Sequence, residues 1–164
     1  MLCVVIVLAI KLSADLEEKR LADMPAIPVT FDTIASHEGD KVSIEGEISV
    51  GSSVSEVDEC GCHECNNIEK YRSCFRLDLT SVDYDPADPQ VHLDMYDTTQ
   101  DKREPNHFYL PTFFDPGEFR IYTNDGQELT EDDPIRVIGF VCDVFESNGR
   151  VYVYMCVIAI EAVK

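Results

Sequence analysis

Three cysteines and a histidine stand within six residues, at positions 60, 62, 63 and 65, and a fourth cysteine follows at position 74. Tetrahedral zinc takes four thiolate or imidazole ligands held close together on a turn. The spacing therefore predicts one structural zinc, although it is not a standard zinc-finger pattern. The expected ligands are Cys60, Cys62, Cys65 and Cys74, with His63 as an alternative.

Two other interpretations of this cysteine cluster remain open. In an oxidising compartment the same thiols would form disulfides that hold the loop, and otherwise they would be surface thiols without a role. A closed set of four protein ligands leaves no coordination position for a substrate. In each case we expect the cluster to stabilise the loop rather than to catalyse a reaction.

The densest basic and aromatic stretch of the chain follows directly, at residues 70–76. Cations mixed with rings are what single-stranded nucleic acid requires of a protein surface. The chain carries 32 acidic against 13 basic residues, a formal net charge of −19, which opposes phosphate binding. We therefore expect a protein partner rather than nucleic acid, and we expect the arginines to pair with nearby carboxylates. The predicted ligand face consists of Lys70, Arg72, Arg76, His92 and Tyr96.

Signatures of common catalytic sites are absent from the sequence. It contains no G-x-S-x-G, no H-E-x-x-H, no phosphate-binding glycine loop and no dinucleotide fingerprint. The sequence favours a binding role over an enzyme. A redox protein that uses the cysteine cluster is a third hypothesis, and it requires a reactive thiolate of lowered pKa.

Alternation of apolar and polar residues predicts the strands that must position these groups. An extra strand is expected at 119–123, and Asn148-Gly149 is a strong signal for a tight hairpin between the last two strands. Cys142 and Cys156 lie on those two strands and could pair if oxidised, or remain buried thiols. The five main strands are expected at 41–50, 74–80, 91–96, 135–145 and 150–160.

The order of these strands resembles the OB fold. The resemblance runs through "KVSIEGEISV", "FRLDL", "VHLDMY", "DDPIRVIGFV" and "GRVYVYMCVIAIEAV", over roughly residues 31–164. It implies an all-β, five-stranded OB-like barrel with long first and third inter-strand loops, preceded by an N-terminal helix. It also implies a ligand face on the second and third strands and the loops around them. It does not imply a particular ligand, since this fold carries many functions.

The N-terminus begins with an apolar run, MLCVVIVLAI, which is too short to span a bilayer as a helix. Residues 1–21 are expected to form a helix that is a signal or anchor, a membrane-dipping segment through residues 1–12, or a helix packed on the barrel. Residues 22–36 are expected to be a linker and 37–164 the barrel domain.

Together these features predict a non-catalytic OB-fold binding module, exported or tethered to a membrane, with a cysteine-rich loop held by zinc or disulfides. The alternative is a cytoplasmic protein that binds single-stranded nucleic acid.

Overall fold

The computed structural model describes residues 23–49, 55–57, 74–83, 85–96, 104–109, 118–131 and 133–163. Within these ranges the chain is all-β, and its one multi-residue helical element is a three-residue 3-10 helix, η1 (Ile34–Ser36). The N-terminal helix expected over residues 1–21 lies outside the described residues.

All five predicted main strands are present, and the last two extend slightly beyond the predicted limits. Four short strands, β1, β3, β6 and β8, were not predicted. The strands are β1 (Ile27–Pro28), β2 (Lys41–Ser49), β3 (Ser55–Val57), β4 (Cys74–Thr80), β5 (Gln90–Tyr96), β6 (Phe108–Tyr109), β7 (Arg120–Tyr122), β8 (Glu128–Leu129), β9 (Ile135–Ser147) and β10 (Arg150–Ala162).

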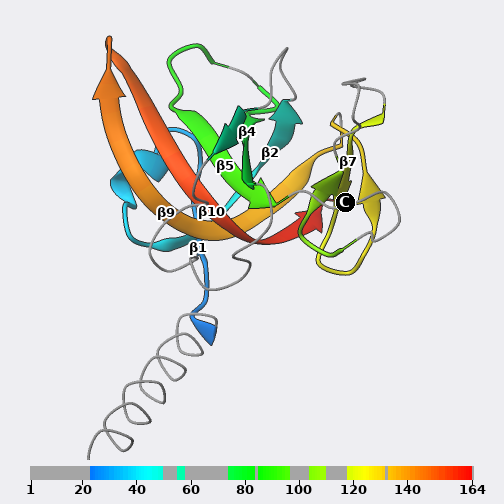
Figure 1. Cartoon of the computed structure of the whole chain (residues 1–164). Helices are drawn as coiled ribbons and strands as arrows, with labels where there is room; N and C mark the ends of the chain where they lie inside the picture. The colour runs from blue at the N-terminus through cyan, green and yellow to red at the C-terminus, as the bar shows by residue number, and fades with distance from the viewer. Residues whose placement is uncertain are drawn as a thin grey trace, which may run out of the picture.

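The pairings of the five long strands return to their starting point. β2 pairs with β9, β9 with β10, β10 with β5, β5 with β4, and β4 again with the far end of β2. All of these pairs are antiparallel except β10 with β5, which is parallel. The hairpin of β9 and β10 is the longest element, and its tip lies at the upper left of Figure 1.

The turn at that tip has the predicted chemistry. Asn148 and Gly149 have backbone φ angles of 53° and 74°, the left-handed values that a two-residue hairpin turn of this kind requires at both positions. The turn sets the register of the hairpin, in which Arg150 lies opposite Ser147 and Tyr152 lies opposite Phe145.

Two glycines allow neighbouring strands to approach closely. A Cβ atom at Gly46 would lie 2.5 Å from the carbonyl oxygen of Thr80, and one at Gly139 would lie 2.3 Å from that of Cys156. The register of β9 and β10 is irregular between Val157 and Ala159, beside Gly139. Both mid-strand glycines thus stand where two backbones meet, a usual place for glycine in a strand.

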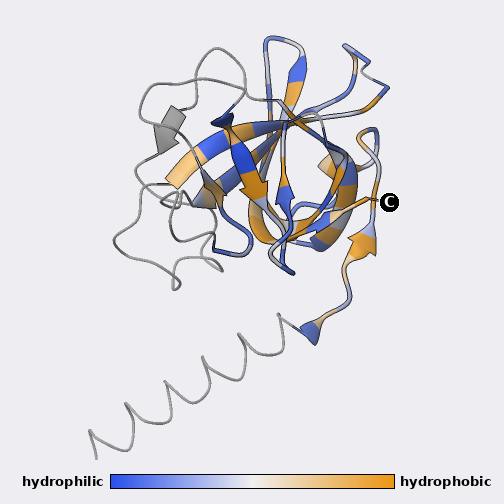
Figure 2. Ribbon diagram, turned by 90° about the vertical axis from the view of Figure 1, so that its right-hand side faces the viewer, coloured by the Kyte–Doolittle hydropathy of each residue, from blue (hydrophilic) through white to orange (hydrophobic). Residues whose placement is uncertain are grey.

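The core lies inside the circuit of strands. Alternate residues point inward, and hydrophobic and hydrophilic segments alternate along the strands in Figure 2. The inward residues of β2, β4, β5, β9 and β10 are almost fully buried; among them are Ile44, Leu77, Leu93, Val137 and Met155.

A second, three-stranded sheet, β6–β7–β8, contributes to the same core. Phe108 and Phe119 are fully buried, and Phe75 of β4 meets Phe108 edge to face with ring centroids 5.6 Å apart. The backbone N–H of Ile160 donates to Oδ1 of Asn106, and that of Asn124 donates to the carbonyl of Ile160. These bonds attach the small sheet to β10.

The segment expected as a linker, described from residue 23, packs on the sheet from β1 onward. β1 pairs in parallel with Val42 and Ser43 of β2. Phe31 and Ile34 are buried in the core cluster. Residues 27–36 therefore form part of the folded body.

Candidate functional site

The outer side of β4, β5, β10 and β9 carries the largest set of interacting rings and charges among the described residues. Alternate residues of these strands, such as Leu93 of β5 and Met155 of β10, point into the core. The residues next to them along each strand therefore point outward. We call eight of these outward residues the aromatic face. They are Arg76, Asp78, His92, Asp94, Asp143, Phe145, Tyr152 and Tyr154.

The strand register brings these residues into rows. His92 lies opposite Asp78 of β4 and beside Tyr154 of β10. Tyr154 in turn lies opposite Asp143 of β9. Residues paired across neighbouring strands share one side of the sheet and lie within side-chain contact, so four strands contribute to a single surface.

Four rings form a continuous stack on this face. Phe145 stacks on Tyr152 and on Tyr154, with centroids 5.1 Å and 5.6 Å away and interplanar angles of 15° and 13°. The His92 ring stacks on Tyr152 at 6.0 Å and tilts against Tyr154 at 5.0 Å. Phe145 is 39% exposed, so that the outermost ring of the stack is accessible to a ligand.

Arg76 is held between a carboxylate and a ring. Its Nε donates to Oδ1 of Asp94 at 3.0 Å and its Nη2 donates to Oδ2 at 3.3 Å. The guanidinium carbon lies 4.1 Å from the centroid of the Tyr154 ring, within cation–π range. Asp94 is only 4% exposed although it points outward, and Arg76 is 30% exposed. The positive charge of Arg76 is therefore compensated on the protein itself.

His92 is oriented by a second carboxylate. Its Nδ1 lies 2.6 Å from Oδ1 of Asp78 and donates to it, since an ionised carboxylate can only accept. The His92 side chain is 15% exposed and that of Asp78 is 57% exposed. Among the described residues, no serine, threonine or cysteine is hydrogen-bonded to His92. The pair orients a ring and presents a carboxylate to solvent.

The structure places three of the five predicted ligand-face residues. Arg76, His92 and Tyr96 lie on the outer side of β4 and β5, and Tyr154 joins Arg76 to His92. The ring of Tyr96 lies 6.2 Å from that of His107, apart from the stack. Lys70 and Arg72 lie outside the described residues.

The rings of the last hairpin were not predicted as part of the site. Tyr152 and Tyr154 are spaced by two, and the Asn148-Gly149 turn sets Phe145 opposite Tyr152. That combination is a usable signal, because a two-residue turn fixes which side chains meet across a hairpin.

The three described cysteines, Cys74, Cys142 and Cys156, are each disulfide-bonded. Cys156 lies opposite Phe140 in the register, and Cys142 falls within a register shift of the hairpin. A pairing of Cys142 with Cys156 stays a prediction.

Of the predicted zinc ligands, only Cys74 is among the described residues. Cys60, Cys62, His63 and Cys65 lie outside the described residues, and the described residues hold no group of three or more metal-ligating side chains. Zinc binds a thiolate, whereas Cys74 is bonded in a disulfide. For Cys74 the structure thus favours the disulfide interpretation.

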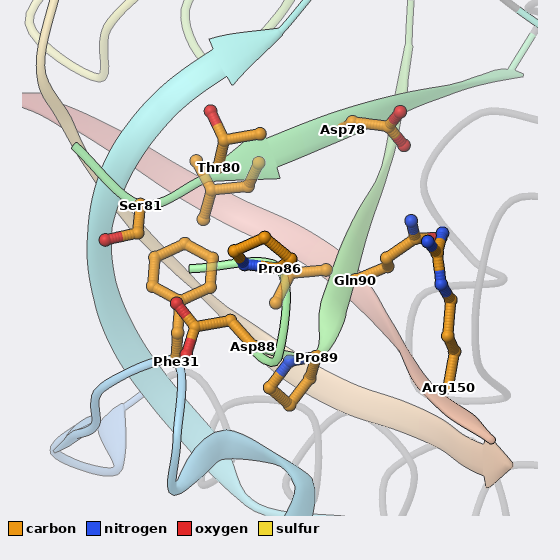
Figure 3. Close-up of a pocket in the computed structure, with 11 residues that line it drawn as sticks. Phe31, Asp78, Thr80, Ser81, Pro86, Asp88, Pro89, Gln90 and Arg150 are labelled. Carbon is orange, nitrogen blue, oxygen red and sulfur yellow. The ribbon is translucent and has the colours of Figure 1, made fainter. Parts of the chain in front are cut away.

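A small cavity of about 80 Å³ opens beside the aromatic face, at the Asp78 end (Figure 3). The turn containing Pro86, Asp88 and Pro89 lies against Phe31 and Gln90 there. Ligand pockets for small molecules usually exceed about 300 Å³, so this cavity is too small for such a ligand.

A wider groove of about 680 Å³ runs between residues 26–32, β2 and β9. Its cation is Arg136, which donates to Glu45 at 2.6 Å and to Glu161 at 3.4 Å. The hydrogen bond and charge of Glu45 raise the pKa of Arg136, so it stays charged. Its charge is matched by two carboxylates, and the groove presents no stack of rings comparable to the aromatic face.

The described part of the chain includes no helix that is both long and apolar enough to cross a membrane. In comparisons with protein-family models, with curated proteins and with solved structures, the chain matches none.

Proposed function

We propose that this protein is a non-catalytic binding module of the OB type, exported or tethered to a membrane, which binds its ligand on the aromatic face. The observation that carries the proposal is the stack of Phe145, Tyr152, Tyr154 and His92 on the outer side of the strands. We further propose that disulfides hold the cysteine-rich segment 51–74, with zinc as the alternative.

The strand order supports the OB-type assignment. An OB barrel is a five-stranded Greek-key barrel, and its ligands contact the second and third strands and the loops after the first and fourth. Here the first long strand, β2, pairs with both the second and the fourth, β4 and β9. The aromatic face lies on β4 and β5, the second and third long strands, and reaches the β9–β10 turn.

The cysteines support export. Disulfides form and persist in oxidising compartments and are rare in the cytosol. All three described cysteines are disulfide-bonded, and the sequence begins with an apolar run at residues 1–10. An exported or membrane-tethered protein accounts for both features.

The first test asks whether the cysteines form disulfides in an oxidising compartment, and it needs no knowledge of the ligand. The full chain would be produced in an oxidising and in a reducing compartment, and thiols and metal would be counted after unfolding. We expect Cys74, Cys142 and Cys156 to be protected from alkylation only in the oxidised product. Protection in neither product, or one bound zinc with free thiols in both, would contradict the disulfide proposal.

The second test concerns the face. Phe145→Ala removes the most exposed ring, and Val82→Ala removes an exposed apolar side chain from a turn as a matched control, since Val82 is 64% exposed. The oxidised full chain and both variants would be screened against immobilised oligosaccharides, peptides and oligonucleotides. The proposal requires that at least one class of ligand binds the unaltered chain and Val82→Ala but does not bind Phe145→Ala.

Binding of single-stranded nucleic acid is the second candidate, because bases stack on aromatic rings. The stack of four rings favours it, while the compensated charge of Arg76 and the net charge of −19 oppose it. It predicts salt-sensitive binding of an oligothymidylate that Arg72→Glu and Arg76→Glu abolish. Absence of binding at low salt would remove this candidate.

A further inference from the structure

We propose that the partner of the aromatic face is a basic polypeptide segment, bound in extended form along β9. The inference rests on the proposed function and gives the chemical class of its ligand. Three features of the described residues lead to it: the charge around the rings, the accessible ring itself, and the edge of β9 beside them.

The face is negatively charged around its rings. Asp78 is 57% exposed and Asp143 is exposed. Of the two arginines at the face, Arg76 is compensated by Asp94, and Arg150 lines the cavity at the Asp78 end. A cation that reaches Phe145 would meet a ring face next to Asp143, two positions away on the same side of β9, and both interactions favour lysine or arginine. The net charge of −19 would also attract a basic partner at long range.

The edge of β9 beside the rings indicates that the cation bound at Phe145 belongs to a polypeptide. β2 pairs with β9 only as far as Phe140, and the backbone of Val141 bonds to Gly39 and Asp40. Among the described strands, β9 from Asp143 to Ser147 pairs with β10 alone. A strand edge of this kind can accept an extended peptide, whose alternate side chains then lie on one side of the sheet.

The same edge is poorly suited to a second copy of this chain. Asp143 and Glu146 are exposed there, and like charges placed opposite each other destabilise strand pairing. Charged side chains on an edge are a known protection against self-association. A basic segment would neutralise Asp143 on the ring side of this edge, whereas a second copy would bring two further carboxylates.

The test measures binding of a fluorescent peptide that alternates lysine with threonine, using the oxidised full chain. Phe145→Ala and Asp143→Asn change the face, and Glu118→Gln is the control, since it removes one exposed carboxylate beside β7 in the other sheet. We expect Phe145→Ala to weaken binding about tenfold, as loss of a central ring in an interface does. Asp143→Asn should weaken binding and reduce its salt dependence, and Glu118→Gln should leave both unchanged.

Control peptides test the extended mode. A peptide with glutamate in place of lysine should not bind. A peptide with proline in place of threonine cannot donate backbone hydrogen bonds at those positions, and it should bind more weakly although its charge is the same. Circular dichroism of each variant verifies that the fold is kept.

Several outcomes would overturn the inference. Equal affinity of the lysine peptide for the chain, Phe145→Ala and Asp143→Asn would place any binding elsewhere. Binding of an oligothymidylate or a neutral oligosaccharide that depends on Phe145, without binding of the lysine peptide, would reject the basic segment and keep the proposed function. A dimer that Asp143→Asn strengthens would assign the edge to a second copy. If no ligand class depends on Phe145, the proposed function fails as well.

Discussion

The buried ion pair under Tyr154 gives the sharpest test of the structure. Arg76→Met removes the guanidinium but keeps most of the aliphatic stem, and it leaves Asp94, which is 4% exposed, without its bidentate partner. Breaking a buried pair from one side costs about 3–5 kcal/mol. We expect the lower end, about 3 kcal/mol, because Arg76 itself is 30% exposed.

This loss is large enough to measure directly. With a urea m-value of about 2–3 kcal/mol/M, the midpoint should fall by about 1–1.5 M, and the melting temperature should fall by about 6–12 °C. The chain has seven tyrosines and no tryptophan, so far-ultraviolet circular dichroism and tyrosine fluorescence would follow unfolding of the oxidised protein.

A control variant and a double variant distinguish the cost of leaving Asp94 buried without a partner from the general effect of removing an arginine. Arg136 also bridges two carboxylates, but its side chain is 44% exposed, so Arg136→Met should shift the midpoint clearly less. The double variant Arg76→Met/Asp94→Leu replaces the pair with apolar groups and should recover most of the lost stability. Additive losses in the double variant, or an equal effect of Arg136→Met, would refute the reasoning.

Three further perturbations have expected outcomes. Gly139→Ala should destabilise the protein by about 1–3 kcal/mol or more, measured by urea denaturation, because its Cβ would lie 2.3 Å from a backbone oxygen of β10; an unchanged midpoint would contradict the close approach. Gly149→Ala, at a φ of 74°, should cost about 1 kcal/mol, with Ser147→Ala as the control. Reduction of the disulfides should lower the free energy of unfolding by about 2–5 kcal/mol for each bond lost, and identical melts with and without reductant would show that the cysteines are unpaired in solution.

Local patterns predicted the main strands and the last turn, because strand alternation and turn residues depend only on neighbouring positions in the sequence. Alternation with period two identified β2, β4, β5, β9 and β10, and Asn148-Gly149 identified the hairpin. The short strands β6 and β8 were missed because two-residue strands show no period. Phe108 lies outside every predicted strand, and it is buried only because the small sheet folds onto β4 and β10.

The role of the predicted ligand face stays a prediction, and the structure gives only the strand positions of three of its residues. Arg76 and His92 do lie on the outer side of β4 and β5, as strand alternation required. Their chemistry was not predictable, because Asp94 and Tyr154 are 18 and 78 positions from Arg76 in the sequence and become its neighbours only through strand pairing. The interpretation that the arginines pair with nearby carboxylates therefore holds for Arg76, whose partner is Asp94.

The sequence by itself determined the charge of the protein, the alternation that builds its long strands and the turn that sets the register of the last hairpin. These depend on residue type and on near neighbours, and they hold whatever the rest of the chain does. Only the tertiary structure decided that Phe145, Tyr152, Tyr154 and His92 form one stack and that Arg76 is neutralised on the protein. The parallel pairing of β10 with β5 joins residues more than fifty positions apart, and no local pattern records which strands will meet.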